Sequence, residues 1–354
     1  MKVTARRMNP TYVFDDSSFN REYGSVDYMG CRTRVAANVN GAEVSEARGN
    51  IFFVTINLPR IGIEAAQGLD KSWDKAIIEK RFFEKLDTVI DVAKRQLLDR
   101  YDYIRENIKA KDMPFAMGQH LYMGSDHLND DDSIEPALKN GTLSMGFIGL
   151  AECLTALTGY HHGESEEANA LGHRIVKYMR DAMDKATKKT HLNFSLFATP
   201  AEGLSGKFTE MDRKKYGEIK GVTDKEYYTN STHIPVKFPI TNFKKIEIEG
   251  AYHKYENAGH ICYVEFKSPL VGNLAALEKI INHMADSDVG YAGINFPIDY
   301  CDECHYQGVI DTEVCPVCGS EGHIHRIRRV TGYFSEIKNM NDAKRAEVRD
   351  RQGN

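Results

Sequence analysis

The sequence lacks the long apolar runs and the one-sided charge that mark several classes of protein. No stretch of the 354 residues approaches 18 uninterrupted apolar positions, and the N-terminus has no apolar core of a secretory signal. Lys and Arg number 46 against 51 Asp and Glu, which argues against a surface that binds nucleic acid as a whole. Internal repeats and low-complexity segments are also lacking. We therefore expect a soluble, cytoplasmic globular protein that makes no contact with a membrane.

Cysteine is scarce, yet four of the seven cysteines lie close together in the sequence. An odd number of cysteines without a signal peptide indicates reduced thiols and excludes a disulfide framework. Two Cys-x-x-Cys pairs, separated by ten residues, are formed by Cys301, Cys304, Cys315 and Cys318. Such pairs place four thiolates around one ion, which is the closed shell of a structural Zn²⁺ site. An iron–sulfur cluster is the alternative, because four cysteines do not by themselves choose the metal.

Strand-like runs alternate with long helical patterns along the chain, which is typical of an α/β fold with several parallel strands. A glycine-containing apolar run over 141–152 precedes a further helix, and a loop-and-strand region is predicted over 117–128. Helices are predicted over 64–109, 166–189 and 273–285. Strands are predicted over 51–59, 192–198, 244–249, 260–266 and 291–296.

The segment after the cysteine pairs admits two interpretations. Three arginines, Arg326, Arg328 and Arg329, would suit a zinc ribbon that binds nucleic acid. The sequence Arg-Arg-Val-Thr-Gly-Tyr-Phe over 328–334, however, resembles the radical loop of glycyl radical enzymes, with Gly332 lying 22 residues before the C-terminus. A Cα radical requires a planar centre that a side chain would crowd, so glycine suits this position. With the cysteine pairs just upstream, the segment resembles the anaerobic (class III) ribonucleoside-triphosphate reductases in particular.

A glycyl radical must pass its unpaired electron to a cysteine, and the resemblance supplies a candidate. The sequence Met-Gly-Cys-Arg-Thr-Arg-Val over 29–35 is similar to the finger loop of this family, and the similarity continues through 48–50 and 53–60. In this interpretation Cys31 becomes a transient thiyl radical and takes the 3′-hydrogen of the ribose. The 2′-hydroxyl then leaves as water, and Gly332 stores the radical between turnovers.

Two further segments, 141–152 and 197–203, resemble elements of the family that lie near the substrate. The second places four candidate substrate-binding residues between a strand and a helix or turn, where backbone N–H groups bind phosphate oxygens: Thr199, Pro200, Ala201 and Glu202. Asn50 is our candidate for a polar side chain near the ribose hydroxyls, with Asn57 as the alternative.

The resemblance implies a ten-stranded α/β barrel of the glycyl radical enzymes, present here as its C-terminal portion, with a zinc-ribbon-like Cys₄ module. We expect a partial catalytic barrel with the finger loop over 1–295, the metal module over 296–325, and the radical loop and tail over 326–354. In family members about half the barrel and an ATP-binding region precede the finger loop, whereas 30 residues precede Cys31 here. A separate N-terminal half would then complete the enzyme. Cys153 and Cys262 lie in no matching motif, and we interpret them as buried structural thiols.

The implied reaction is the anaerobic reduction of ribonucleoside triphosphates to 2′-deoxyribonucleoside triphosphates for DNA synthesis. The implied partners are an iron–sulfur activase that uses S-adenosylmethionine to generate the glycyl radical, a formate or thioredoxin-type reductant, and a second copy in a homodimer. Two alternative functions fit the sequence less well. A glycyl radical lyase of the pyruvate formate-lyase type uses adjacent cysteines, and the sequence has no Cys-Cys pair. A non-catalytic zinc-ribbon binding protein would leave the segments around Cys31 and Thr199 without a role.

Overall fold

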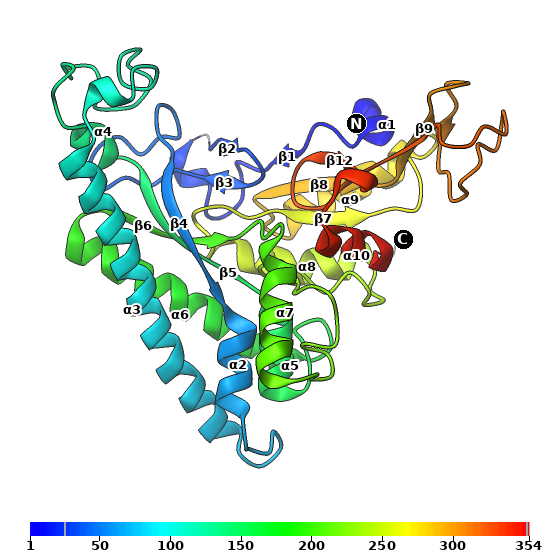
Figure 1. Ribbon diagram of the computed structural model, residues 1–354, viewed down its shortest axis with the longest axis horizontal. Coiled ribbons are helices and arrows are strands. Elements are labelled where there is room, and N and C mark those ends of the chain that lie inside the picture. Colours follow the sequence, from blue (N-terminus) through cyan, green and yellow to red (C-terminus); the bar gives the residue numbers. More distant parts are fainter. Residues whose placement is uncertain (25, 352, 354) are drawn as a thin grey trace.

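A parallel sheet forms the centre of the chain, for which a computed structural model describes residues 1–24, 26–351 and 353 (Figure 1). Its strands are ordered β4-β5-β6, with bounds Asn50–Asn57, Thr142–Ile148 and Asn193–Ala198. Thr55 pairs with Gly146, which in turn pairs with Phe197. All residues of β5 and β6 are buried, as expected for strands covered on both faces.

Two long helices cover one face of this sheet. They are α3 (Lys75–Asn107) and α6 (Glu166–Thr190), which lie side by side in Figure 1. Apolar residues of α3 recur at spacings of three and four and pack on alternate residues of β5 such as Met145 and Phe147. The opposite face of β4–β6 carries Thr, Ser and Asn side chains, so the sequence alternation gives this sheet one apolar and one polar face.

A second, mixed sheet has the order β1-β8-β7, with bounds Tyr12–Val13, Tyr291–Asn295 and Cys262–Glu265. Strands β7 and β8 run parallel, and β1 pairs antiparallel with β8. The helices α1 (Lys2–Arg7) and α9 (Leu274–Asp286) contribute Ala5, Leu277 and Met284 to the hydrophobic core that packs against this sheet. Isolated bridges at Gly259 connect this half of the molecule to β3 and β6.

The segment of the four late cysteines and the loop of Gly332 share a third sheet, which is antiparallel and ordered β10-β9-β11-β12. Its strands span Gln307–Gly308, Ile298–Cys301, Ile324–Arg329 and Phe334–Glu336. The loops that carry the later cysteines project from the body of the molecule in Figure 1. Gly332 lies in the turn between β11 and β12, so the sheet connects the cysteine pairs directly to the loop of Gly332.

The remaining elements complete the connections between these sheets. A hairpin is formed by β2 (Tyr28–Met29) and β3 (Thr33–Arg34). The other helices are α2 (Leu58–Ala66), α4 (Glu135–Leu138), α5 (Leu150–Thr158), α7 (Leu204–Tyr216), α8 (Asn242–His253) and α10 (Asp342–Asp350), with short 3₁₀ turns at Arg21–Tyr23, Ala110–Asp112 and Ile337–Asn339. None of the helices in the described part of the chain is long and apolar enough for a membrane crossing.

Several predicted elements are confirmed and others are corrected. The α/β class is confirmed, and β4, β6, β7, β8, α6 and α9 match predicted segments. The strand predicted over 244–249 is wrong, because these residues lie in α8. The helix predicted over 64–109 is interrupted between Ala66 and Lys75, where Gly68 adopts a φ of +76°. No strand is found over 117–128 among the described residues. The described strands form open sheets, so a ten-stranded barrel and the three domain boundaries stay predictions.

Candidate functional site

The thiol of Cys31 lies at the tip of the β2–β3 hairpin. Met29 pairs with Thr33, so Gly30, Cys31 and Arg32 form the turn, and Gly30 adopts a φ of +55° that favours glycine. The Arg32 guanidinium donates from Nη1 to the carbonyl of Ala198 at 3.4 Å, at the end of β6. The hairpin is therefore held over the carboxyl end of the central parallel sheet, where ligands bind in open α/β folds.

A second arginine, Arg34, connects the hairpin to neighbouring segments of the chain. Arg34 donates to the Asn20 side chain at 2.8 Å and to the carbonyls of Phe19 and Asn257 at 2.9 and 3.2 Å. Gly259 packs against the Arg32 carbonyl with a φ of +130°, where a side chain would collide with it. These contacts hold the short hairpin in place through two arginines, Arg32 and Arg34, that are both buried.

Gly332 lies directly against Cys31, although the two lie 301 positions apart in the sequence. A Cβ atom built on Gly332 would lie 2.6 Å from the Cβ atom and 2.9 Å from the Sγ atom of Cys31. The φ of Gly332 is +132°, which L-residues with a side chain rarely adopt. The structure thus brings together the two residues that the sequence singled out, at van der Waals contact.

The environment of Cys31 keeps its thiol protonated. Burial raises the pKa of Cys31, and Glu202 adds to this effect, while Arg32 and Lys344 oppose it. A raised pKa means that the S–H bond is intact at neutral pH. Transfer of a hydrogen atom requires that bond, whereas nucleophilic catalysis would require a thiolate.

The polar face of the central sheet carries the two asparagines that the sequence offers as candidates for contacts with the ribose. Asn50 donates from its side-chain amide to Thr142 Oγ1 at 2.9 Å and also to Ser144 Oγ, so it is held by β5. The hydroxyls of Thr55 and Thr199 lie 3.1 Å apart. Asn57, the alternative to Asn50, instead accepts from the Arg60 N–H at 3.1 Å and thereby caps α2.

The predicted substrate-binding segment of Thr199, Pro200, Ala201 and Glu202 connects β6 to α7, as the sequence pattern indicated. Two of its backbone N–H groups already have partners, because Ala201 donates to Asn230 Oδ1 at 2.8 Å and Glu202 to the Pro200 carbonyl at 2.9 Å. The Glu202 carboxylate accepts a hydrogen bond from the Tyr333 hydroxyl at 3.0 Å. Substrate binding by this segment stays a prediction.

A buried polar cluster lies beside Arg32. The Arg32 side chain is 1% exposed, and its Nε atom has no hydrogen-bond partner within the described residues. Glu256 is fully buried nearby and accepts from the Thr232 hydroxyl at 3.0 Å. Burial raises the pKa of Glu256 to about 8, against the opposing effects of Thr232 and Arg32. This carboxyl group is therefore protonated at neutral pH.

The buried Glu256 predicts a pH-dependent stability. A glutamate in the unfolded chain titrates near pH 4.3, so between that value and about pH 8 the folded chain binds more protons than the unfolded one. The free energy of unfolding should therefore fall as the pH rises through this window, by up to about 1.4 kcal/mol per pH unit. Urea denaturation between pH 5 and 9 should show a flatter dependence for Glu256→Gln. The matched change at exposed Glu210, to Gln, should leave the slope unaltered; equal slopes for all three proteins would contradict the prediction.

The four late cysteines converge as the sequence predicted. Their Sγ atoms all lie within 4.8 Å of one another, with 3.8 Å between Cys301 and Cys318 and 3.6 Å between Cys304 and Cys315. A tetrahedron of sulfur atoms around zinc, with Zn–S bonds of about 2.3 Å, has edges of about 3.8 Å. The four residues therefore fit a zinc ion, and the structure supports a four-cysteine metal site.

The other two cysteines are buried structural residues, as expected. Cys153 packs in the core of the central sheet and Cys262 in that of the β7–β8 sheet, and both are fully buried. Two residues that contact the loop of Gly332 were not indicated by the sequence, namely Lys344 and Arg351. The tail after His323 shows little core-forming pattern, yet α10 buries Ala343, Lys344 and Ala346.

Comparison with known proteins shows a match along almost the whole chain. The family model described as anaerobic ribonucleoside-triphosphate reductase matches residues 1–353. The curated enzymes of that name from Escherichia coli (strain K12) and Haemophilus influenzae are 33% and 35% identical over 367 and 366 residues. Each alignment covers 99% of this chain and 49% of the relative, so the chain spans about half the length of these curated relatives.

The fold agrees with this match. The crystal structure of the anaerobic ribonucleotide reductase from Thermotoga maritima with glycerol in the active site superposes with a TM-score of 0.72 at 18% identity, covering 98% of this chain and 52% of the other. The family match extends over both the hairpin of Cys31 and the loop of Gly332. The chain therefore belongs to the anaerobic ribonucleoside-triphosphate reductase family.

Proposed function

We propose that this chain carries the radical chemistry of an anaerobic ribonucleoside-triphosphate reductase, which converts ribonucleoside triphosphates into 2′-deoxyribonucleoside triphosphates. The observation that carries the proposal is the contact between Gly332 and Cys31. A structural zinc ribbon with no catalytic role would not require a glycine at a φ of +132° pressed against a protonated thiol. The absence of a Cys-Cys pair in the sequence argues against the lyase alternative.

In the proposed reaction the two residues exchange a hydrogen atom. The Cα radical of Gly332 takes the hydrogen from the Cys31 thiol, which leaves the unpaired electron on sulfur. The sulfur then abstracts the 3′-hydrogen of the ribose, because S–H and activated C–H bonds have similar strengths. The 2′-hydroxyl takes up a proton and leaves as water. A two-electron reductant, formate or a thioredoxin-type dithiol, supplies the electrons that complete the deoxyribose, and Cys31 returns its hydrogen to C3′.

Other residues have supporting parts in the proposal. Asn50, held by β5, would present polar atoms to the ribose, and the segment from Thr199 to Glu202 would lie near the substrate. Zinc held by the four late cysteines would supply structural rigidity to the sheet that bears the radical loop, with no part in the reaction. The glycyl radical would be generated by a separate iron–sulfur activase with S-adenosylmethionine, since these side chains offer no such chemistry.

The proposal is tested by a turnover assay that separates radical storage from hydrogen abstraction. The chain is activated anaerobically with a radical S-adenosylmethionine activase, supplemented with the remaining half of a full-length relative, and given CTP with formate or a dithiol. We expect dCTP from the wild-type chain. Cys31→Ala should retain the glycyl radical signal in electron paramagnetic resonance spectra but form no dCTP. Reduction of CTP by Cys31→Ala, or no dCTP and no radical signal in any preparation, would refute the proposal.

A further inference from the structure

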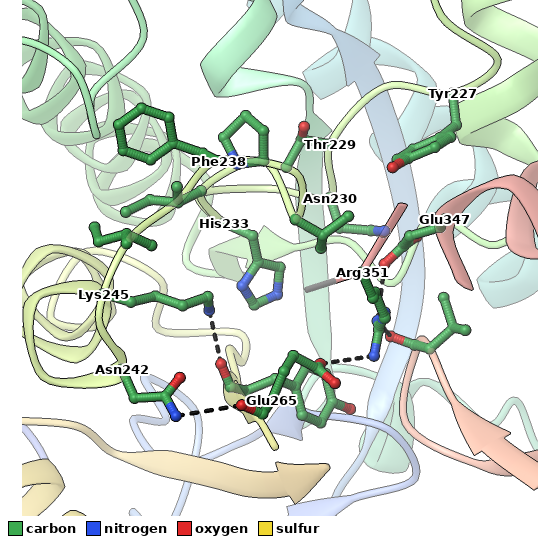
Figure 2. Close-up of a pocket in the computed structure, with 16 residues that line it drawn as sticks. Tyr227, Thr229, Asn230, His233, Phe238, Asn242, Lys245, Glu265, Glu347 and Arg351 are labelled. Atoms are coloured by element: carbon green, nitrogen blue, oxygen red, sulfur yellow. Dashed lines mark hydrogen bonds and ion pairs between the residues drawn. The ribbon is translucent and has the colours of Figure 1, made fainter. Parts of the chain in front are cut away.

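Helix α10 and the residue after it contact the radical loop on both sides of Gly332. Arg351, which follows α10, donates to the carbonyl of Arg329 at 2.8 Å and to that of Val330 at 3.2 Å. It also pairs with Glu265 of β7 at 2.7 Å and with Glu347 at 2.8 Å, as Figure 2 shows. The backbone immediately before the glycine is therefore attached to the β7–β8 sheet through one buried guanidinium group.

On the other side of Gly332, Lys344 of α10 contacts Tyr333. The Nζ atom donates to the Tyr333 hydroxyl at 2.6 Å and lies 4.3 Å from the centre of its ring. The same hydroxyl donates to Glu202 Oε2 at 3.0 Å, and Lys344 pairs with Glu202 at 3.2 Å. An ammonium group, a phenol and a carboxylate thus form a closed triangle between α10, the radical loop and the segment after β6.

We propose that Lys344 is a positioning residue that, through Tyr333 and Glu202, holds Gly332 against Cys31. The inference rests on the proposed function and goes beyond it, because it assigns a role to a helix outside the radical loop. The Lys344 side chain is 6% exposed, whereas Tyr333 and the Glu202 side chain are 46% and 42% exposed. Burying an ammonium group is costly unless it is paired, and an apolar residue would fill the same volume without that cost. The triangle therefore specifies a geometry for Tyr333, and the adjacent Gly332 follows it.

The two charged members of the triangle also influence the Cys31 thiol. Glu202 raises the pKa of Cys31 and Lys344 lowers it. In a variant without the Lys344 charge, the change in the pKa of Cys31 and the change in its access therefore have opposite effects on the alkylation rate. Loss of the Lys344 charge would raise the pKa of Cys31 further and slow any reaction that requires the thiolate. Faster alkylation of Cys31 in such a variant can then come from greater access alone.

The test measures how well Gly332 covers Cys31 in the unactivated, full chain. The chain is labelled with iodoacetamide at pH 8, and mass spectrometry measures the rate at which the peptide that contains Cys31 is alkylated. We expect Lys344→Met and Tyr333→Phe each to accelerate labelling at least tenfold, and Lys344→Arg to restore the wild-type rate to within threefold. Arg349→Met is the matched control, because Arg349 lies on the same helix and pairs with Glu226 at the surface. Its labelling rate should equal that of the wild type.

A second measurement uses the activated enzyme. Lys344→Met should keep the glycyl radical signal within twofold, lower kcat at least tenfold and change KM for the nucleotide by less than threefold. Unchanged labelling and kcat in both Lys344→Met and Tyr333→Phe would overturn the positioning role, as would equal effects of Arg349→Met. Absence of a radical signal from the activated wild-type chain, with labelling still accelerated in Lys344→Met, would instead refute the proposed function and leave the contact intact.

Discussion

Replacing Gly332 with alanine is expected to abolish both the radical signal and nucleotide reduction. The added Cβ atom would lie 2.6 Å from the Cβ atom of Cys31 and 2.8 Å from its Cα atom, closer than real Cβ atoms approach their neighbours. The backbone at a φ of +132° also disfavours alanine by about 1–3 kcal/mol. Either the loop moves away from the thiol or the hairpin is displaced, and both outcomes break the path of hydrogen transfer. Electron paramagnetic resonance of the activated chain should show a doublet for wild type, which deuterated glycine collapses, and none for Gly332→Ala.

A matched control separates crowding from backbone strain. Gly322 also has a positive φ, +78°, but a Cβ atom there would meet nothing within 4 Å. Gly322→Ala should therefore retain the radical signal and at least half of the wild-type turnover. Brief exposure of the activated wild-type chain to air should cut the backbone at Gly332 and release a C-terminal peptide of about 2–3 kDa. An intact doublet in Gly332→Ala, or cleavage of that variant, would show that the radical resides elsewhere.

Loss of the four-cysteine metal site is expected to release the radical loop as well as the metal. Structural zinc sites contribute about 10–16 kcal/mol of binding free energy to small folded modules. Cys301 belongs to β9, which pairs with β11, and β11 leads directly into the loop of Gly332. Cys304→Ser should lower the metal content from about one zinc per chain to nearly none. Hydrogen exchange should then become fast throughout β9–β12, and the yield of glycyl radical should fall severalfold.

The control for this experiment is Cys31→Ser, which removes a thiol outside the metal site and should leave zinc content and exchange in β9–β12 unchanged. Elemental analysis of anaerobically prepared protein supplies the metal content directly. Iron in place of zinc would favour the cluster that the four cysteines also admit. Full protection of β11 in metal-free Cys304→Ser would contradict the structural link between the module and the loop.

Local patterns in the sequence predicted most of the fold, and the predictions that were wrong have identifiable physical causes. Alternating Ile246 and Ile248 indicated a strand, yet the side chain of Thr241 caps a helix there and Lys245 pairs with Glu249 one turn later at 2.6 Å. Helical capping and an i,i+4 ion pair thus prevailed over a period-2 pattern. The break before α3 follows from Gly68 and from Asp70, whose carboxylate accepts from the Ser72 N–H at 2.8 Å.

Sequence motifs predicted which residues belong to the candidate site, but not how these residues are arranged in space. The cysteine spacing predicted a four-thiolate cluster, and family resemblance selected Cys31 and Gly332. No local pattern indicates that these two residues touch, because the contact depends on how a hairpin and a distant sheet pack on the β6 end. The burial of Lys344 likewise could not be predicted from the sequence, because a lysine in a charged tail is usually solvated. Its burial depends on α10 packing beside α7, where Ala343 approaches Gly206.

The distance in sequence between Cys31 and Gly332 has a consequence for biosynthesis. At about 5–20 residues per second, translation of the 301 residues from Arg32 to Gly332 takes on the order of 15–60 s. Throughout that time the hairpin thiol of a nascent chain has no glycine above it. A chain that terminates before the last sheet is made contains the sulfur but has no residue to store a radical beside it. In the proposed reaction an incomplete polypeptide therefore cannot hold a radical beside Cys31, and no inhibitor or protease is needed to prevent it.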